Sequence, residues 1–122
     1  KGKTITYEGK KITPEKATIL KKGLQVTIIL DTSMCDNAIK IAKESDVLIC
    51  ESTFSKEEEG LAKEYKHLTA EQAALIAKKA KVKQLILAHF SQRYQDIKEL
   101  EKEAKKIFKN TLAVKDLEVI TI

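Results

Sequence analysis

Three apolar segments of the sequence each end in a side chain that could take part in catalysis or metal binding. Asp31 follows the run VTIIL, Glu51 follows VLIC, and His89 follows QLILA. Short apolar runs of this kind predict buried strands. The carboxyl ends of parallel strands meet at one edge of a sheet, where α/β proteins form their sites. We therefore expect the three side chains to gather there.

Each of these residues also has a purely structural interpretation. Asp31 could bind or bridge metal ions, or hydrogen-bond its own turn. Glu51 could orient a histidine and hold its proton, or be a surface glutamate. His89 could be a ligand or a core histidine, and His67 lies either at a predicted helix N-terminus or simply on the surface. Two histidines and one aspartate do not make a hydrolytic metal centre unaided, so a metal-dependent reaction would need ligands from outside this chain.

The remaining segments predict the elements that would position these side chains. Residues 4–12 alternate around a Glu-Gly turn and predict a short β-hairpin. Apolar residues at helical spacing predict three helices: one with Asp36 as its N-cap, one that begins at the capping box of Thr69 and Gln72, and one that begins at Asp96. The helices and the apolar runs alternate along the chain, which favours an α/β fold.

The ends of the predicted sheet are less strongly marked. Residues 111–114 and 117–122 are expected to be closing strands. The charged residues 55–65 favour a short exposed helix or a loop. With no repeat, low-complexity tract or linker in the sequence, we predict one compact piece over residues 1–122.

The charge of the chain is compatible with a polyanionic partner such as RNA. Its formal charge is +5 and its pI is about 9.1. Arg93 is the single arginine among the 23 basic residues, and most of the lysines stand among glutamates on the predicted helices. A solvated Lys/Glu surface of a heat-adapted protein has the same composition, so both interpretations stay open.

Several functional classes are disfavoured by composition. Cys35 and Cys50 have no C-x-x-C spacing, which indicates reduced thiols rather than a disulfide framework, and we expect a cytoplasmic protein. No apolar run is long enough to predict a membrane span, and we expect no secretory signal. The four glycines form no phosphate-binding loop, and neither Ser33 nor Ser91 has the context of a nucleophilic serine.

Four short segments carry most of these polar residues: 30–32 (LDT), 50–54 (CESTF), 67–74 (HLTAEQAA) and 88–94 (AHFSQRY). Together and in this order they resemble the C-terminal part of the ribonuclease Z family, the tRNA 3′-end endonucleases of the metallo-β-lactamase superfamily. The corresponding family motifs are Gly-Asp-Thr, His-Glu-Ala-Thr-Phe, His-Ser-Thr and Thr-His-Phe-Ser-Pro-Arg-Tyr. The spacings between Asp31, His67 and His89 also suit this family.

The chain departs from these motifs at four positions, where Leu30, Cys50, Leu68 and Gln92 stand for the family's Gly, His, Ser and Pro. None of the four is an expected ligand, but each lies in a turn or loop beside one. Leu68 in particular would remove a hydroxyl from the neighbourhood of the site.

The resemblance implies a fold and a substrate. The fold is a metallo-β-lactamase-like αββα sandwich, an α/β architecture of which this chain would be about the C-terminal half. The substrate is precursor tRNA, whose 3′ trailer the enzyme removes. By the same resemblance, Ser91, Arg93 and Tyr94 would hold the RNA backbone near the cleavage point, with Arg93 supplying a planar fork for phosphate.

The resemblance also implies the metal and the catalytic groups. The cofactor would be zinc, two ions in the full-length enzyme. Asp31 would bridge the two ions, and His89 would complete one of the two sites. His67 and Glu51 would act as the catalytic pair that transfers a proton to the leaving 3′-oxygen.

The family's His-x-His-x-Asp-His motif and a further zinc histidine do not occur in these residues. We therefore expect the 122-residue chain alone to bind zinc weakly and to cleave no RNA. A half-sandwich would expose a large apolar face, which favours a homodimer or a longer polypeptide. Two alternatives stay open at this point: another phosphodiesterase or hydrolase of the same superfamily, and a non-catalytic α/β interaction module.

Overall fold

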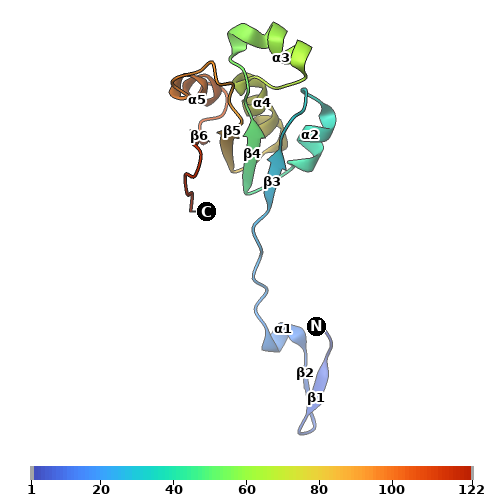
Figure 1. Ribbon diagram of the computed structural model, residues 1–122. Coiled ribbons are helices and arrows are strands. Elements are labelled where there is room, and N and C mark those ends of the chain that lie inside the picture. The colour runs from blue at the N-terminus through green and yellow to red at the C-terminus, as the bar shows by residue number, and fades with distance from the viewer. Residues whose placement is uncertain (1, 122) are drawn as a thin grey trace.

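A four-stranded parallel sheet forms the centre of the structure, a computed structural model that describes residues 2–121. The strands, in spatial order, are β3 (Val26–Ile29), β4 (Val47–Glu51), β5 (Gln84–Ala88) and β6 (Thr111–Ala113). Each strand runs parallel to its neighbour. The carboxyl ends of β3, β4 and β5 therefore meet at one edge of the sheet, as the sequence predicted (Figure 1).

Helices α2 (Asp36–Ile41), α4 (Ala70–Ala80) and α5 (Lys98–Lys105) connect the strands. The central helix, α4, packs on β4 and β5 and contacts both other helices. It begins at the predicted capping box, in which Thr69 Oγ1 accepts the Gln72 N–H and Gln72 Oε1 accepts the Thr69 N–H, each at 3.1 Å. The side chains that α4 buries are mostly alanines, so its backbone can approach the sheet closely.

Two predicted helix starts differ from the structure by one or two residues. Asp36 is the first residue of α2 rather than its N-cap, a position that Cys35 occupies. Its carboxylate instead lies in the first turn, where negative charge is favourable. Asp96 precedes α5 by two residues and accepts the Lys98 N–H at 2.9 Å, so its side chain satisfies a donor at the helix start.

The two faces of the sheet differ in what covers them. Helices cover one face, where the buried core contains alternate residues of three strands: Ile29, Leu48, Cys50, Leu85 and Leu87. On the other face, Ile28, Ile49, Ile86 and Leu112 form one row across the four strands. The exposed fraction is 61% for Ile28 and 39% for Leu112. This apolar face is thus open at its two outer strands, whereas Ile86 on β5 is buried, and open apolar positions are expected of one half of a sandwich.

The N-terminal elements lie apart from the sheet (Figure 1). Strands β1 (Ile5–Tyr7) and β2 (Lys10–Ile12) form the predicted antiparallel hairpin, and the short helix α1 (Pro14–Ala17) follows it. An extended segment over residues 18–25 joins them to β3. We expected one compact piece over residues 1–122, whereas the packed part of the structure begins at β3.

Two further segments lie outside the sheet: the charged residues that follow β4 and the residues that follow β6. Residues 55–65 form the 3₁₀ turn η1 (Lys56–Glu58) and helix α3 (Glu59–Tyr65), which lies beyond the carboxyl ends of the strands (Figure 1). The strand predicted over residues 117–122 is wrong for its described residues, 117–121. Residues 115–118 instead form a turn, in which the Glu118 N–H donates to the Lys115 carbonyl and the Lys115 N–H to the Glu118 carboxylate.

In the described part of the chain, we find no helix with the length and hydropathy needed to cross a bilayer.

The two thiols should differ sharply in reactivity. Cys35 is exposed, whereas Cys50 lies inside the core on β4. Burial, reinforced by the neighbouring Glu51 carboxylate, raises the pKa of the Cys50 thiol, and only the thiolate is nucleophilic. We expect a disulfide reagent such as DTNB to modify one thiol in the native chain and both in denaturant. With Cys35→Ser as the control that leaves Cys50 alone, rapid native labelling of that variant would contradict this placement.

Candidate active site

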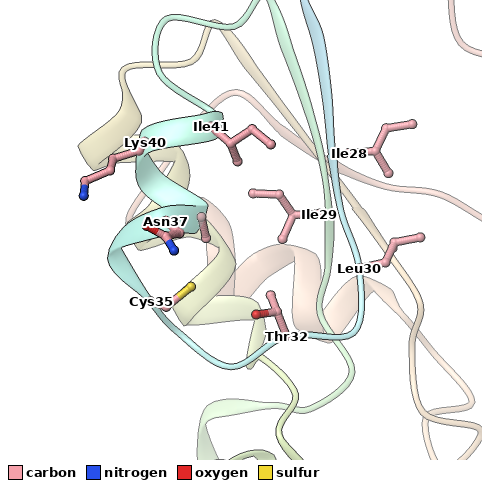
Figure 2. Close-up of a pocket in the computed structure, with 9 residues that line it drawn as sticks. Ile28, Ile29, Leu30, Thr32, Cys35, Asn37, Lys40 and Ile41 are labelled. Carbon is pink, nitrogen blue, oxygen red and sulfur yellow. The ribbon is translucent and has the colours of Figure 1, made fainter.

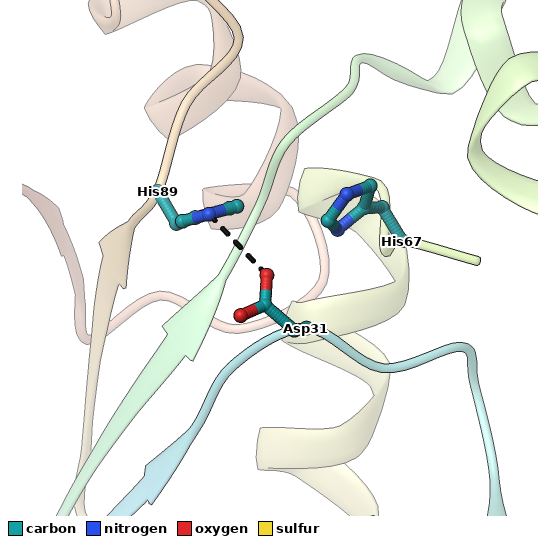
Figure 3. A group of neighbouring side chains, drawn as sticks. All are labelled: Asp31, His67 and His89. Carbon is teal, nitrogen blue, oxygen red and sulfur yellow. Dashed lines mark ion pairs between the residues drawn. The ribbon is translucent and has the colours of Figure 1, made fainter. Parts of the chain in front are cut away.

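Asp31, His67 and His89 converge beyond the carboxyl edge of the sheet (Figure 3). One ligand atom of each side chain lies within 4.8 Å of the other two. Asp31 follows β3, His89 follows β5, and His67 lies between α3 and α4. The three residues come from distant parts of the sequence, so it is the parallel topology that brings them together.

The backbone turns sharply beside each of the three residues. Asp31 and His89 adopt left-handed conformations, with φ of 52° and 57°, immediately after their strands. Lys66 ends α3 with a φ of 61°, directly before His67. A left-handed conformation costs a residue with a Cβ about 1–2 kcal/mol. Such strain is found where a turn has to direct a side chain, and here it directs all three to one point.

The buried carboxylate of Glu51 holds the surrounding loops in place. It is fully buried and accepts hydrogen bonds from four donors. The distances to its oxygens are 2.6 Å from Thr32 N, 2.8 Å from Thr53 Oγ1, 2.9 Å from His67 Nδ1 and 3.1 Å from Leu68 N. Both carboxylate oxygens are thus hydrogen-bonded, and the bond to Nδ1 leaves Nε2 as the free nitrogen of His67.

Thr53 extends this network to His89. Its hydroxyl has one proton and two acceptors within reach, the Glu51 carboxylate at 2.8 Å and the His89 carbonyl at 3.0 Å, of which the carboxylate is the stronger. Thr53 Oγ1 then accepts from His89 Nδ1, 3.0 Å away. This assignment protonates Nδ1 of His89 and leaves its Nε2 with a lone pair, which faces Asp31 Oδ1 at 3.4 Å. A lone pair and a carboxylate oxygen attract each other only through a cation, either a proton or a metal ion.

The three side chains fit part of a zinc site. Zinc binds imidazole nitrogen and carboxylate oxygen at about 2.0–2.2 Å, so two ligands on one tetrahedral ion lie roughly 3.3–3.6 Å apart. The 3.4 Å between His89 Nε2 and Asp31 Oδ1 falls in this range. Both histidines also bind a neighbouring oxygen through Nδ1, the usual outer-shell arrangement of histidine ligands. The Asp31 side chain is 71% exposed, which leaves room for ligands from elsewhere.

Ser91, Arg93 and Tyr94 form a cluster beside the group of Asp31, His67 and His89 rather than part of it. The turn that carries them is joined to the site by a hydrogen bond from the Ser91 N–H to the Thr53 carbonyl, at 3.1 Å. Phe54 lies between the two groups, because the Arg93 guanidinium stacks 5.2 Å from its ring centre and the His67 ring lies 6.2 Å from it. The residues expected to contact RNA therefore border the group that could hold a metal ion.

Three of the four departures from the family motifs, at Leu30, Cys50 and Leu68, are compatible with this geometry. Cys50 and Leu68 are fully buried in the core, and only the backbone N–H of Leu68 reaches Glu51. At this turn the residue with the left-handed conformation is Asp31 and not Leu30. Sequence reasoning had not singled out Thr53, whose importance comes from two contacts to residues 2 and 36 positions away.

A separate hollow of about 570 Å³ lies between β3 and α2, with Ile29 and Ile41 projecting into it (Figure 2). Ile28 and Leu30 point to the opposite side of the strand. None of Asp31, His67 and His89 lines this hollow. It is an uncovered edge of the apolar core, separate from the cluster that these three residues form.

Sequence comparison relates the chain to one group of proteins. It is 48% identical over 113 residues to a ribonuclease Z of Protochlamydia amoebophila, and 45% identical over 125 positions to a ribonuclease Z of Enterococcus faecalis. These matches cover 93% and 100% of the chain but 37% and 40% of the relatives. The chain thus spans about two-fifths of the length of these relatives. No protein-family model matches it.

Solved structures agree with the sequence comparison. Human tRNase Z, short form, is 34% identical with a TM-score of 0.63, over 82% of this chain and 34% of that protein. A metallo-β-lactamase fold protein from Bacillus subtilis is 28% identical with a TM-score of 0.66, over 72% and 35%. The sheet and its helices therefore have the architecture of part of a metallo-β-lactamase fold.

Replacing Glu51 should destabilise the chain strongly. In Glu51→Gln the amide keeps one acceptor oxygen and turns an NH₂ group toward donors, so at least one buried donor loses its partner. We expect the free energy of unfolding to fall by about 2–3 kcal/mol, measured by urea denaturation. Glu64→Gln, on the exposed side of α3, is the matched control and should unfold like wild type. Equal stability of the two variants would show that the network does not hold the loops.

Proposed function

Because the chain belongs to the ribonuclease Z family, we propose that it forms the C-terminal part of a metal-dependent endoribonuclease that removes the 3′ trailer from precursor tRNA. The observation that carries this proposal is the convergence of Asp31, His67 and His89 above a buried Glu51 that orients one of the histidines. The family relationship supplies the substrate, and the geometry supports hydrolysis of a phosphodiester.

Asp31 and His89 are the proposed metal ligands. The Asp31 carboxylate has two oxygens and is largely exposed, so it can bridge two ions. Nε2 of His89, with its lone pair held toward Asp31 by Thr53, completes one of the two sites. Two zinc ions, when bound, supply Lewis-acid activation of the scissile phosphate and of the attacking water. The remaining ligands would come from the part of the protein that precedes this chain.

His67 and Glu51 are the proposed proton-transfer pair. The Nδ1 proton of His67 binds the Glu51 carboxylate at 2.9 Å, which fixes the tautomer and the orientation of the ring. Nε2 is then free to hand a proton to the leaving 3′-oxygen, and the buried carboxylate stabilises the imidazolium before transfer. Ser91, Arg93 and Tyr94 would bind the RNA backbone on the neighbouring rim.

The open face of the sheet suits the other half of the same fold. Ile28 and Leu112 lie at the two sides of an apolar row and are exposed in the described residues, whereas Ile86 within the row is buried. We propose that the preceding half of an αββα sandwich packs on this row and that the assembled protein is a homodimer. Since both thiols are unpaired, we place the protein in the cytoplasm, where thiols stay reduced.

Cleavage of precursor tRNA by the full-length protein tests the proposal. With zinc present, the wild-type protein should release the 3′ trailer. Asp31→Ala and His89→Ala should each lower kcat/KM at least about 100-fold. Each removes a proposed metal ligand, and even the loss of a group that only orients a ligand costs about 10- to 100-fold. His67→Ala should lower kcat similarly while leaving bound zinc unchanged. The 122-residue chain alone should show no cleavage.

Asp36→Asn, at an exposed acidic residue in the first turn of α2, is the control and should keep wild-type activity. Hydrolysis of a simple phosphodiester such as bis(p-nitrophenyl) phosphate, with no cleavage of precursor tRNA, would contradict precursor tRNA as the substrate. It would favour another hydrolase of the superfamily. If the full-length protein contains no metal and cleaves neither substrate, the proposal that it is an enzyme is wrong.

A further inference from the structure

The charged segment that precedes α3 contributes one side chain to the proposed RNA-binding rim. Glu58, at the end of η1, reaches across to the turn after β5. One of its carboxylate oxygens binds the Arg93 guanidinium and the other binds the Tyr94 hydroxyl. A single carboxylate thus holds both of the long side chains that are proposed to contact RNA.

The hydrogen bonds around Tyr94 have only one consistent direction. The Ser55 N–H donates to the Tyr94 hydroxyl at 2.7 Å, so the hydroxyl oxygen is already an acceptor. Its single proton must therefore go to Glu58. This bond and the Arg93 charge lower the pKa of the Glu58 carboxyl, while burial and Glu58 raise the pKa of Tyr94. The Tyr94 hydroxyl is therefore held by one donor, the Ser55 N–H, and by one acceptor, the Glu58 carboxylate.

Arg93 is held by three contacts, and part of its side chain is still exposed to solvent. Besides Glu58, its Nε–H donates to Ser91 Oγ at 3.2 Å, and its guanidinium stacks 5.2 Å from the Phe54 ring centre. These contacts use two of the five N–H donors of the guanidinium. Its side chain remains 42% exposed, so donors stay available to a phosphate group.

We propose that Glu58 is a positioning residue that holds Arg93 and Tyr94 in the orientation that binds the RNA backbone. This inference rests on the proposed function, because it assigns Glu58 to the substrate rim of the same site. An isolated surface ion pair usually contributes little. Here the carboxylate receives two different donors, and its partners are further held by Ser55, Ser91 and Phe54. The cluster therefore orders both side chains before RNA arrives.

The opposite role for Glu58 would be that of an internal competitor, which neutralises Arg93 until a phosphate displaces it. The two roles predict opposite signs. A positioning carboxylate improves RNA binding, so its loss weakens binding. A competing carboxylate occupies the guanidinium, so its loss strengthens binding. The remaining exposure and free donors of Arg93 favour positioning.

Kinetics of the full-length protein on precursor tRNA separate these roles. In Glu58→Gln we expect KM to rise about 3- to 10-fold with kcat nearly unchanged, as for loss of one oriented phosphate contact. Glu57→Gln, the exposed neighbour in the same 3₁₀ turn, should leave both parameters unchanged. In an Arg93→Ala background, Glu58→Gln should add much less than it does alone, because the two residues act together.

A titration that needs no RNA tests the Glu58–Tyr94 link separately. Tyrosinate absorbance, compared with that of Tyr94→Phe, should show a lower pKa for Tyr94 in Glu58→Gln, since the nearby negative charge is gone. A wild-type protein that does not cleave precursor tRNA overturns the proposed function and this inference together. An active wild type whose Glu58→Gln variant has an unchanged or lower KM, or an unchanged Tyr94 titration, overturns this inference alone.

Discussion

The buried carboxylate of Glu51 is the constraint on which the rest of the site depends. Burying a charge costs several kcal/mol unless it is fully hydrogen-bonded, and Glu51 meets this requirement with four donors from three separate segments. These bonds hold three parts of the site to the carboxylate. They are the turn after Asp31, the Thr53 side chain that reaches His89, and the His67 ring together with the Leu68 backbone N–H. Folding of the loops and assembly of the site are consequently one event.

The surrounding elements explain why the carboxylate lies at this point. It is the last residue of β4, a strand with a neighbour on each side in the sheet, so its side chain emerges at the carboxyl edge of the sheet. Backbone hydrogen bonds tie Phe54 to the segment before α4, through the Leu68 carbonyl at 3.2 Å and the Ala70 N–H at 2.9 Å. The capping box then starts α4 directly after His67 and Leu68.

Much of this arrangement could be predicted from the sequence, because local patterns and strand topology determine it. The strands that end at Asp31, Glu51 and His89 and the α4 capping box follow from periodicity and spacing. The pairing of His67 with Glu51 rested on family resemblance alone. Thr53 and Glu58 were not predicted, since their partners lie 36 and 35 residues away and nothing local marks such contacts. The predicted strand near Leu117 failed because a side-chain hydrogen bond closes a turn there, a competition that periodicity does not report.

We propose that Asp31 and His89 bind a metal ion while the buried Glu51 holds His67 beside them. Anomalous scattering at the zinc edge from crystals of the full-length protein tests this. We expect a zinc peak about 2.0–2.2 Å from an Asp31 carboxylate oxygen and from His89 Nε2, with His67 Nδ1 still bonded to Glu51. A zinc peak bound by other residues, or Asp31 and His89 without a metal while zinc occupies another site, would contradict it.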